Sequence, residues 1–353
     1  MARRWGLDAG RYRSTMRKRV TLTDVAKVAG VHPGTVSRAL TDATQDQVSQ
    51  ETVRRIRKVA KELGYTPNTV ARGLRTNKSM TIGVIVPDLT NPIFPPIVRG
   101  IDSFLAPRGY SSLVVNTDGS DETERNLFGS LLERQVDGFI IATGHSNHQL
   151  MVEAHERGVQ AVMVNRDAAG VPYPAVTGDD SQGIFAGVKH LVELGHKRLL
   201  HLAGPAGFST SRIRADAFVA ACRQVGIDGH VVHTTAYSVA AGQSAMDKVL
   251  DQKLDEYTAV IASNDLLALG TYHSLRTHGL RCPEDMSVVG FNDMLFANDF
   301  QPPLTTVRSP HFEMGVEAAR LLLNEIAGTL PSGARVTLPV SLIVRGSTGP
   351  ARK

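Results

Sequence analysis

The chain has 353 residues, of which 42% are hydrophobic and 21% are charged, and its net charge at pH 7 is +5. This length and composition allow roughly two or three domains with buried cores, and they exclude a fibrous or wholly disordered protein. No apolar run approaches the roughly 18 residues of a membrane-spanning helix. Two cysteines are too few for a disulfide framework, and no secretory signal follows the basic N-terminus. We therefore expect a cytoplasmic protein.

The positive charge is concentrated at the N-terminus. Residues 1–78 contain 17 lysine or arginine residues and 6 aspartate or glutamate residues, a net charge of +11. Residues 79–353 contain the remaining 22 basic and 28 acidic residues, a net charge of −6. A basic end on an acidic body is typical of a protein that docks one end on a polyanion such as DNA. A solvated basic tail is the alternative. Residues 1–19 show no periodicity, and we expect them to form a disordered arm.

Short amphipathic segments follow this arm. A threonine can cap a first helix that ends at Gly30, and Pro33 suits the first turn of a second helix. A third helix is predicted from its cap Ser49 to Gly64. Three helices with a tight glycine turn between the first two are typical of a helix-turn-helix domain, here over residues 20–66. An ordinary three-helix bundle is the alternative.

The second predicted helix carries side chains suited to DNA. Thr35 and Ser37 offer short hydroxyl groups to phosphates, and Arg38 has a planar fork that can pair with O6 and N7 of guanine.

Two stretches resemble a known family. TLTDVAKVAGVHPGTVSRAL and VSQETVRRIRKVAKELGYTPNTVARGLRTNKSMTIGVIVPD are similar to the head of the LacI/GalR family of transcriptional regulators, and the resemblance continues to about Gly349. His32 departs from the family pattern because it stands where a serine cap is usual, and Gly73 stands where a longer or polar residue is usual.

The resemblance implies a hinge over residues 67–78 that becomes a helix on the DNA, with Leu74 entering the minor groove. A helix of about eight residues is too short to be stable alone, so we expect it to order only on its target. A plain linker is the alternative. The predicted DNA-contacting residues of the head and hinge are Thr21, Thr23, His32, Pro33, Gly34, Thr35, Ser37, Arg38, Asn68, Ala71, Leu74 and Arg75.

Apolar runs alternate with helical patterns in the rest of the chain. The runs, each predicted to form a buried strand, are 81–86, 112–116, 138–143, 161–165, 198–204, 259–263 and 287–291. Such strands with helices between them indicate parallel sheets covered on both faces, and their number favours two lobes.

The resemblance implies the same fold class for the body, a bilobed α/β fold like that of the periplasmic sugar-binding proteins, joined to a small all-α helix-turn-helix head. It places chain crossings near Thr177 and Val307 and a last one over 336–339. The expected lobes comprise about 79–177 with 308–336 and about 178–307 with 337–349.

Ligands of open α/β sheets bind beyond the C-terminal ends of the strands. The polar and aromatic residues at these strand ends are therefore the candidates, among them Thr143 and Asn165 with Arg166. The resemblance assigns effector contacts to a subset of the strand-end residues. The full set is Ile93, Phe94, Thr143, Asn165, Arg212, Tyr237, Asn264 and Asn292. Phe94 is alternatively a packing residue, and Asp265 is expected to cap the helix that follows it.

Asn165 and Asn292 stand where relatives usually carry acids, which leaves neutral sugars, sugar acids and sugar phosphates open as ligands. Arg212 could bind a carboxylate or phosphate as a fork.

Motifs for catalysis and cofactor binding are missing. The sequence contains no Walker loop, G-x-G-x-x-G, H-E-x-x-H or G-x-S-x-G motif, so we expect neither enzyme activity nor a cofactor. His145 and His148 lie in a polar loop and are expected to be solvated, with no metal site. We expect a repressor that binds a palindromic DNA operator as a homodimer and not a tetramer, because the leucine-repeat helix of the tetrameric form is missing. The alternatives are a small-molecule receptor or a sugar-acting enzyme with a DNA-binding head.

Overall fold

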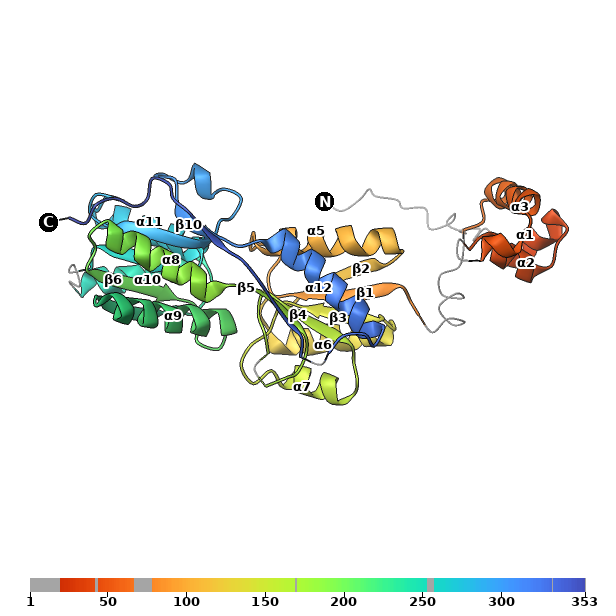
Figure 1. Ribbon diagram of the computed structural model, residues 1–353, viewed down its shortest axis with the longest axis horizontal. Helices are drawn as coiled ribbons and strands as arrows, with labels where there is room; N and C mark the ends of the chain where they lie inside the picture. Colours follow the sequence, from red (N-terminus) through yellow and green to blue (C-terminus); the bar gives the residue numbers. More distant parts are fainter. Residues whose placement is uncertain are drawn as a thin grey trace, which may run out of the picture. The chain divides into compact units, whose positions relative to one another are not determined.

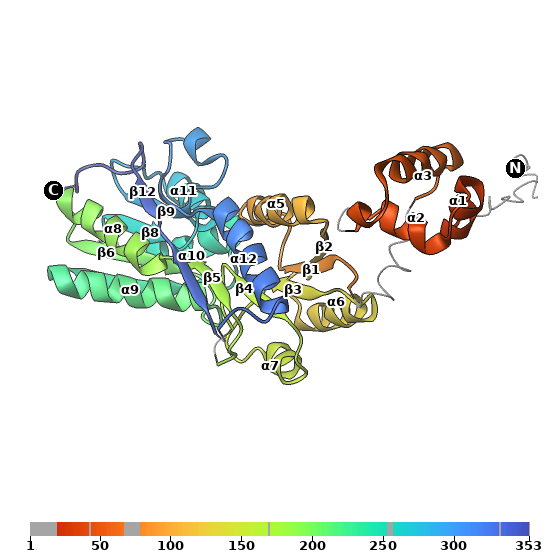
Figure 2. The same cartoon turned by 45° about the vertical axis from the view of Figure 1, so that its right-hand side comes forward.

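The computed structural model describes residues 20–41, 44–66, 78–168, 170–252, 257–331 and 333–352. The chain divides between Asn77 and Lys78 into two compact units, here called the head and the body (Figures 1 and 2). None of the described helices is long and apolar enough to cross a bilayer.

The head is a small all-α domain. Its helical elements are α1 (Leu22–Ala29), α2 (Pro33–Ala39), the 3₁₀ turn η1 (Gln45–Gln47) and α3 (Gln50–Leu63). Val25, Val36 and Ile56, one from each α-helix, are fully buried against one another. Gly30 ends α1 with a positive φ of 66°, a conformation that glycine adopts without steric cost. The predicted helix-turn-helix arrangement is therefore confirmed.

Polar caps fix the ends of the head helices. Thr21 accepts a hydrogen bond from the Asp24 backbone N–H at 3.3 Å, and the Asp24 carboxylate accepts one from the Thr21 N–H at 2.8 Å. His32 replaces the usual serine at the start of α2, and its Nδ1 accepts a hydrogen bond from the Gly34 N–H at 3.1 Å. The imidazole thus takes the role of a hydroxyl cap, which explains how the sequence tolerates this departure.

The body contains two sheets, each the centre of one lobe. The N-lobe sheet has the strand order β11-β5-β4-β3-β1-β2 and all its described pairings are parallel. Its strands are β1 (Thr81–Val86), β2 (Ser111–Asn116), β3 (Gly138–Ile141), β4 (Ala161–Val164), β5 (Ala175–Gly178) and β11 (Arg335–Leu338). Helices α5 (Phe94–Leu105) and α12 (His311–Ile326) pack on one face, and α6 (Asp121–Glu133) and α7 (Gln149–Glu156) pack on the other. A 3₁₀ turn, η2 (Ala106–Arg108), follows α5.

The C-lobe repeats this three-layer plan. Its strand order is β12-β10-β9-β8-β6-β7, with β12 antiparallel to β10 and the other pairings parallel. The strands are β6 (Arg198–Ala203), β7 (Asp228–His233), β8 (Ala259–Ala262), β9 (Ser287–Asn292), β10 (Thr305–Arg308) and β12 (Ser341–Ile343). Helices α10 (Val239–Asp251) and α11 (Asp265–Thr277) cover one face, and α8 (Asp180–Glu193) and α9 (Ser209–Val225) cover the other. The turn η3 (Ala297–Asp299) lies between β9 and β10.

The chain passes between the lobes after β5, after β10 and after β11, as Figure 1 shows. All seven predicted strands form. The antiparallel β12 departs from the expectation of wholly parallel lobes. Such a strand can be added antiparallel because it arrives after a direct crossing from β11 and not through a βαβ unit.

Two glycines bring the N-lobe helices α5 and α12 into close contact. A Cβ at Gly100 would lie 2.0 Å from the Phe312 carbonyl oxygen, and one at Gly315 would lie 2.0 Å from the Ile97 carbonyl oxygen. Both distances are far below van der Waals contact, so only glycine permits this helix crossing.

Candidate functional site

A small cavity lies between the two lobes of the body, at the C-terminal ends of their strands. The N-lobe contributes residues that follow β1 and β4, and the C-lobe contributes residues from α9, from the loops after β7 and β8, and from β9. The lining residues are Asn91, Ile93, Asn165, Arg166, Thr210, Arg214, Tyr237, Asn264 and Asn292. The space left between them is about 10 Å³, room for about one water molecule. A sugar-sized ligand therefore requires the lobes to move apart.

The structure brings five of the eight candidate effector residues to this cavity: Ile93, Asn165, Tyr237, Asn264 and Asn292. Asn165 and Asn292 have positive φ angles of 65° and 113°, which the short amide side chain tolerates better than most. Tyr237 lies with its hydroxyl 3.2 Å from the Thr210 hydroxyl.

The side chain of Asn264 also has a structural role. It accepts a hydrogen bond from the Leu267 N–H at 2.9 Å and so caps α11. The expectation that Asp265 caps this helix is therefore wrong. Asp265 instead accepts hydrogen bonds from the Thr306 hydroxyl at 2.6 Å and the Met294 N–H at 2.7 Å, and burial raises its pKa to about 7.

The other candidate effector residues lie elsewhere. Phe94 is fully buried at the start of α5, in the N-lobe core. The Arg212 side chain is 56% exposed and lies 4.0 Å from Asp216. The Thr143 hydroxyl donates a hydrogen bond to the Glu124 carboxylate.

Arg214, two positions after Arg212, takes the place in the cavity that was expected of Arg212. It lies one helical turn before the fully buried Phe218, so both face inward from α9. Its guanidinium donates to the Asp180 carboxylate at 2.9 Å and to the Ser263 carbonyl oxygen, and it stacks 3.7 Å from the centre of the Phe291 ring. The sequence signal was the inward spacing of Arg214 and Phe218.

Arg166 is the second buried guanidinium of the cavity. It stacks 4.0 Å from the centre of the Phe208 ring and 5.4 Å from that of Tyr237, with only 5% of its surface exposed. No carboxylate of the described residues forms an ion pair with it, and its Nε has no hydrogen-bond partner among them. Burial lowers the pKa of Arg166 to about 10. The cavity thus holds a cation that the described side chains do not neutralise.

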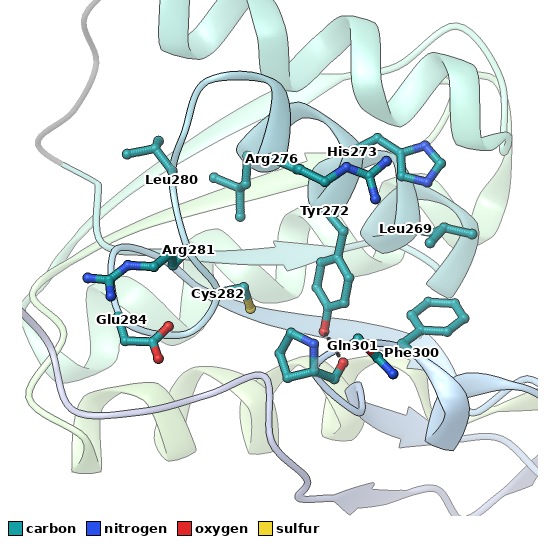
Figure 3. Close-up of a pocket in the computed structure, with 12 residues that line it drawn as sticks. Leu269, Tyr272, His273, Arg276, Leu280, Arg281, Cys282, Glu284, Phe300 and Gln301 are labelled. Carbon is teal, nitrogen blue, oxygen red and sulfur yellow. Dashed lines mark hydrogen bonds between the residues drawn. The ribbon is translucent and has the colours of Figure 1, made fainter.

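A second, larger hollow of about 410 Å³ lies on the outer side of α11 in the C-lobe. Its lining is largely apolar, with Leu269, Tyr272, Leu280 and Phe300 among the residues that Figure 3 labels. The Tyr272 hydroxyl donates to the Pro302 carbonyl oxygen at 3.0 Å.

The predicted DNA-contacting residues of the head lie at its surface or partly below it. Arg38 and Thr23 are exposed, and Thr35 and Ser37 are half-buried on α2. Pro33 and Gly34 form the first turn of α2, directly after its cap His32, whereas Thr21 caps α1. Asn68, Ala71, Leu74 and Arg75 lie outside the described residues.

The expectation that His145 and His148 are solvated is wrong for His148, which is only 3% exposed. Its Nε2 lies 3.3 Å from the buried Glu124 carboxylate.

Comparison with known proteins identifies the family of this chain. The model of bacterial regulatory proteins of the lacI family matches residues 21–68, and that of the periplasmic binding protein-like domain matches residues 188–348. The HTH-type transcriptional repressor CytR of Escherichia coli (strain K12) is 36% identical over 331 residues, which cover 93% of this chain and 96% of the relative. The chain belongs to the LacI family. It is therefore a DNA-binding transcriptional regulator.

Other relatives of this LacI-family regulator are similar over the same span. The Ribose operon repressor of Bacillus subtilis (strain 168) is 33% identical, with 93% of this chain and 98% of the relative covered. A crystal structure of the lac repressor dimer bound to operator and the anti-inducer ONPF has a TM-score of 0.83 and 30% identity. The match covers 94% of this chain and 100% of that chain. A CelR–cellobiose complex has a TM-score of 0.71, 32% identity and coverage of 93% and 100%.

Proposed function

We propose that this LacI-family chain is a repressor that binds a palindromic operator as a homodimer in the cytoplasm and changes its affinity for DNA when a small metabolite enters the interlobe cavity. Residues 20–66 read DNA, 67–78 form the hinge, and 79–353 bind the effector and the second subunit. The chain catalyses no reaction of its own. Relatives solved with operator, cellobiose or ribose support this division of roles.

The observation that carries the effector part of the proposal is the interlobe cavity itself. Its residues come from both lobes, and its free space is much smaller than a sugar. A ligand that binds there favours one lobe arrangement over another, which is the requirement for a ligand to shift a conformational equilibrium. A coupling free energy of about 1–3 kcal/mol then changes operator affinity about 5–150-fold.

The charges of the cavity favour an anionic sugar derivative, such as a sugar acid or a sugar phosphate. Arg166 has no described acidic partner, Arg214 is balanced by Asp180, and no carboxylate is among the described residues that line the cavity. Asn165 and Asn292 supply neutral amides to the lining. A carboxylate or phosphate on the ligand would neutralise Arg166 with two parallel hydrogen bonds, while the amides would bind hydroxyl groups.

A selection from genomic fragments tests the regulatory function. Purified protein is mixed with sheared source DNA at moderate salt, and the retained fragments are sequenced, with and without mixtures of neutral sugars, sugar acids and sugar phosphates. We expect a short palindrome to be enriched, and its enrichment to change with the anionic mixtures. Enrichment of no sequence under any of these conditions would contradict sequence-specific regulation.

Replacing Arg38 with alanine is expected to weaken specific DNA binding by about 1–3 kcal/mol and to relax the preference at one base pair in each half-site. Arg38 is exposed on α2, where its fork can reach a base edge. Binding to variants of the selected palindrome measures the preference. Lys58→Ala is the control, because Lys58 is an exposed cation on α3 and not on α2. An Arg38→Ala protein with the wild-type base preference would exclude the base contact.

The apolar hollow on α11 supports the homodimer. Leu295 and Phe296 lie just before η3, close in sequence to Phe300 of the hollow, and they are 79% and 59% exposed. Adjacent exposed apolar residues of this size indicate a protein–protein contact. We therefore place a subunit contact on this side of the C-lobe.

Phe296→Glu is expected to convert the dimer to monomers, because it places a charge in an apolar contact. Light scattering during size-exclusion chromatography measures the mass. Val219→Glu is the matched control, since Val219 is an exposed valine on α9, which covers the opposite face of the same sheet. Operator affinity should fall in parallel, because one head reads only one half-site. A dimeric Phe296→Glu protein would place the contact elsewhere.

A further inference from the structure

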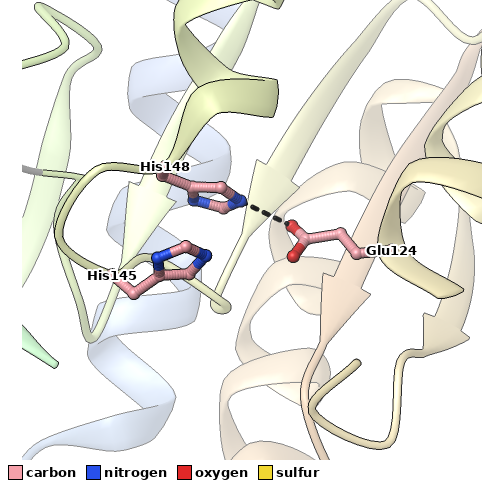
Figure 4. A group of neighbouring side chains, drawn as sticks. All are labelled: Glu124, His145 and His148. Atoms are coloured by element: carbon pink, nitrogen blue, oxygen red, sulfur yellow. Dashed lines mark ion pairs between the residues drawn. The ribbon is translucent and has the colours of Figure 1, made fainter. Parts of the chain in front are cut away.

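Glu124, His145 and His148 form a compact cluster in the N-lobe, and none of the three lines the interlobe cavity. Glu124 lies in the first turns of α6, and the histidines lie in the loop that joins β3 to α7 (Figure 4). One ligand-type atom from each side chain lies within 4.8 Å of the others. The fold therefore brings together two imidazoles and a carboxylate that are about twenty residues apart in sequence.

The carboxylate of Glu124 is buried and lacks a permanent positive partner. Its residue is 3% exposed, and no lysine or arginine within the described ranges forms an ion pair with it. The Thr143 hydroxyl donates to Oε1, and His148 Nε2 lies 3.3 Å from the same oxygen. Burying a carboxylate is unfavourable unless hydrogen bonds and a cation compensate it. A cation at this place would supply that compensation.

Each of the two imidazoles offers one ring nitrogen to a metal ion. His145 Nδ1 donates to the Ser146 carbonyl oxygen at 2.9 Å, which leaves a lone pair on Nε2. His145 Nε2 and His148 Nδ1 are buried without a hydrogen-bond partner in the described part of the chain. The rings stack 4.1 Å apart. Ligand histidines in proteins usually donate their second ring nitrogen to a carbonyl or carboxylate, and ligand carboxylates are usually hydrogen-bonded themselves.

We propose that this cluster binds a divalent transition metal of the zinc type. His145 through Nε2, His148 through one ring nitrogen and Glu124 through its carboxylate supply three ligands. Asp121, at 3.5 Å from His145 Nε2 and 83% exposed, or a water molecule, completes a tetrahedron. Zinc accepts this mixed nitrogen and oxygen set, whereas magnesium and calcium prefer oxygen ligands alone.

The bound metal has a structural consequence for the lobes. It joins the β3–α7 loop to α6, and the same loop contacts the C-lobe, where the Ser146 N–H donates to the Gly207 carbonyl oxygen at 2.8 Å. A metal that fixes this loop therefore stabilises a surface against which the lobes close.

Metal titration of the untagged full-length chain tests the proposal after treatment with a chelator. Competition with a chromophoric chelator should show one tightly bound Zn²⁺ per chain and no competition by Mg²⁺ or Ca²⁺. Co²⁺ should give the intense visible absorption of a tetrahedral complex. Binding of Zn²⁺ no tighter than millimolar to the wild-type chain would overturn the proposal.

Matched variants locate the site. Glu124→Gln and His145→Asn should each weaken Zn²⁺ binding by more than about 100-fold, and Thr143→Val, which removes only the hydrogen bond to Glu124, by about 10–100-fold. His155→Gln is the control, because His155 is exposed on α7 and contacts Tyr173, not the cluster. His145 is partly exposed, so its variant remains informative if Glu124→Gln does not fold. Equal Zn²⁺ affinity in His145→Asn and His155→Gln would refute this site.

Discussion

Replacing Arg166 with methionine is expected to remove the response to an anionic effector and, at the same time, to raise the stability of the body. Arg166 is a buried cation over two aromatic rings, without a carboxylate partner among the described residues. Methionine keeps the packing on Phe208 and removes the cost of burying the charge. We expect a gain of about 1–4 kcal/mol in the free energy of unfolding and a loss of at least about 100-fold in effector affinity.

Replacing Arg214, the other buried arginine of the cavity, should lower the stability of the body. Arg214→Met leaves Asp180 buried without its partner and removes the hydrogen bond to the Ser263 carbonyl, so the free energy of unfolding should fall by about 3–5 kcal/mol. Urea denaturation measures the free energy of unfolding of each variant. Calorimetric titration with sugar acids and sugar phosphates measures effector affinity. If Arg166→Met is destabilised like Arg214→Met, Arg166 is a structural residue and the anion preference is wrong.

Gly315→Ala is expected to destabilise the body by more than about 3 kcal/mol, because its Cβ would lie 2.0 Å from the Ile97 carbonyl oxygen. The backbone oxygen cannot rotate away, so α5 and α12 must separate and part of the N-lobe core must open. Gly100→Ala should have a similar effect for the same reason.

Gly129→Ala is the matched control for this prediction. Gly129 also lies in an N-lobe helix, α6, but a Cβ added there would meet no atom of another described segment within 4 Å. Alanine there should leave stability unchanged or raise it by up to about 1 kcal/mol. Thermal and urea denaturation of the three variants measure the effect. Equal stability of Gly315→Ala and Gly129→Ala would show that the helices are not as close as described.

Periodicity predicted most of the regular structure, because buried strands and amphipathic helices differ in the spacing of their apolar residues. Strands β7 and β12 were not predicted from periodicity. Both lie at sheet edges and are partly exposed, so polar residues interrupt their pattern, as in DGHVVH. Strands β5, β10 and β11 were foreseen only as crossings implied by the family resemblance.

The candidate site was predicted in position but not in its charge. The rule that ligands bind at strand ends identified the asparagines, yet it could not decide which of two arginines on α9 faces inward. The spacing of Arg214 and Phe218 is the signal in the sequence that selects Arg214, and the assembled core shows that Phe218 faces inward. The lack of a described partner for Arg166 was equally hidden, since partners come from distant segments.

The cluster of Glu124 and two histidines was also beyond sequence reasoning. His145 and His148 lie in a polar segment, and polar composition normally indicates exposure. Burial of His148 depends on α6, which approaches only because β2 and β3 flank β1 in the same sheet.

The most direct test measures the affinity of two proteins, wild type and Arg166→Met, for the selected operator. Each affinity is measured with and without an anionic sugar derivative. The derivative is one that stabilises the wild-type protein. We predict that the ligand changes wild-type affinity about 5–150-fold. Arg166→Met should bind the operator as the ligand-free wild type does and should not respond. An unchanged response in Arg166→Met, or a ligand that binds wild type without altering operator affinity, would contradict control of DNA binding from the interlobe cavity.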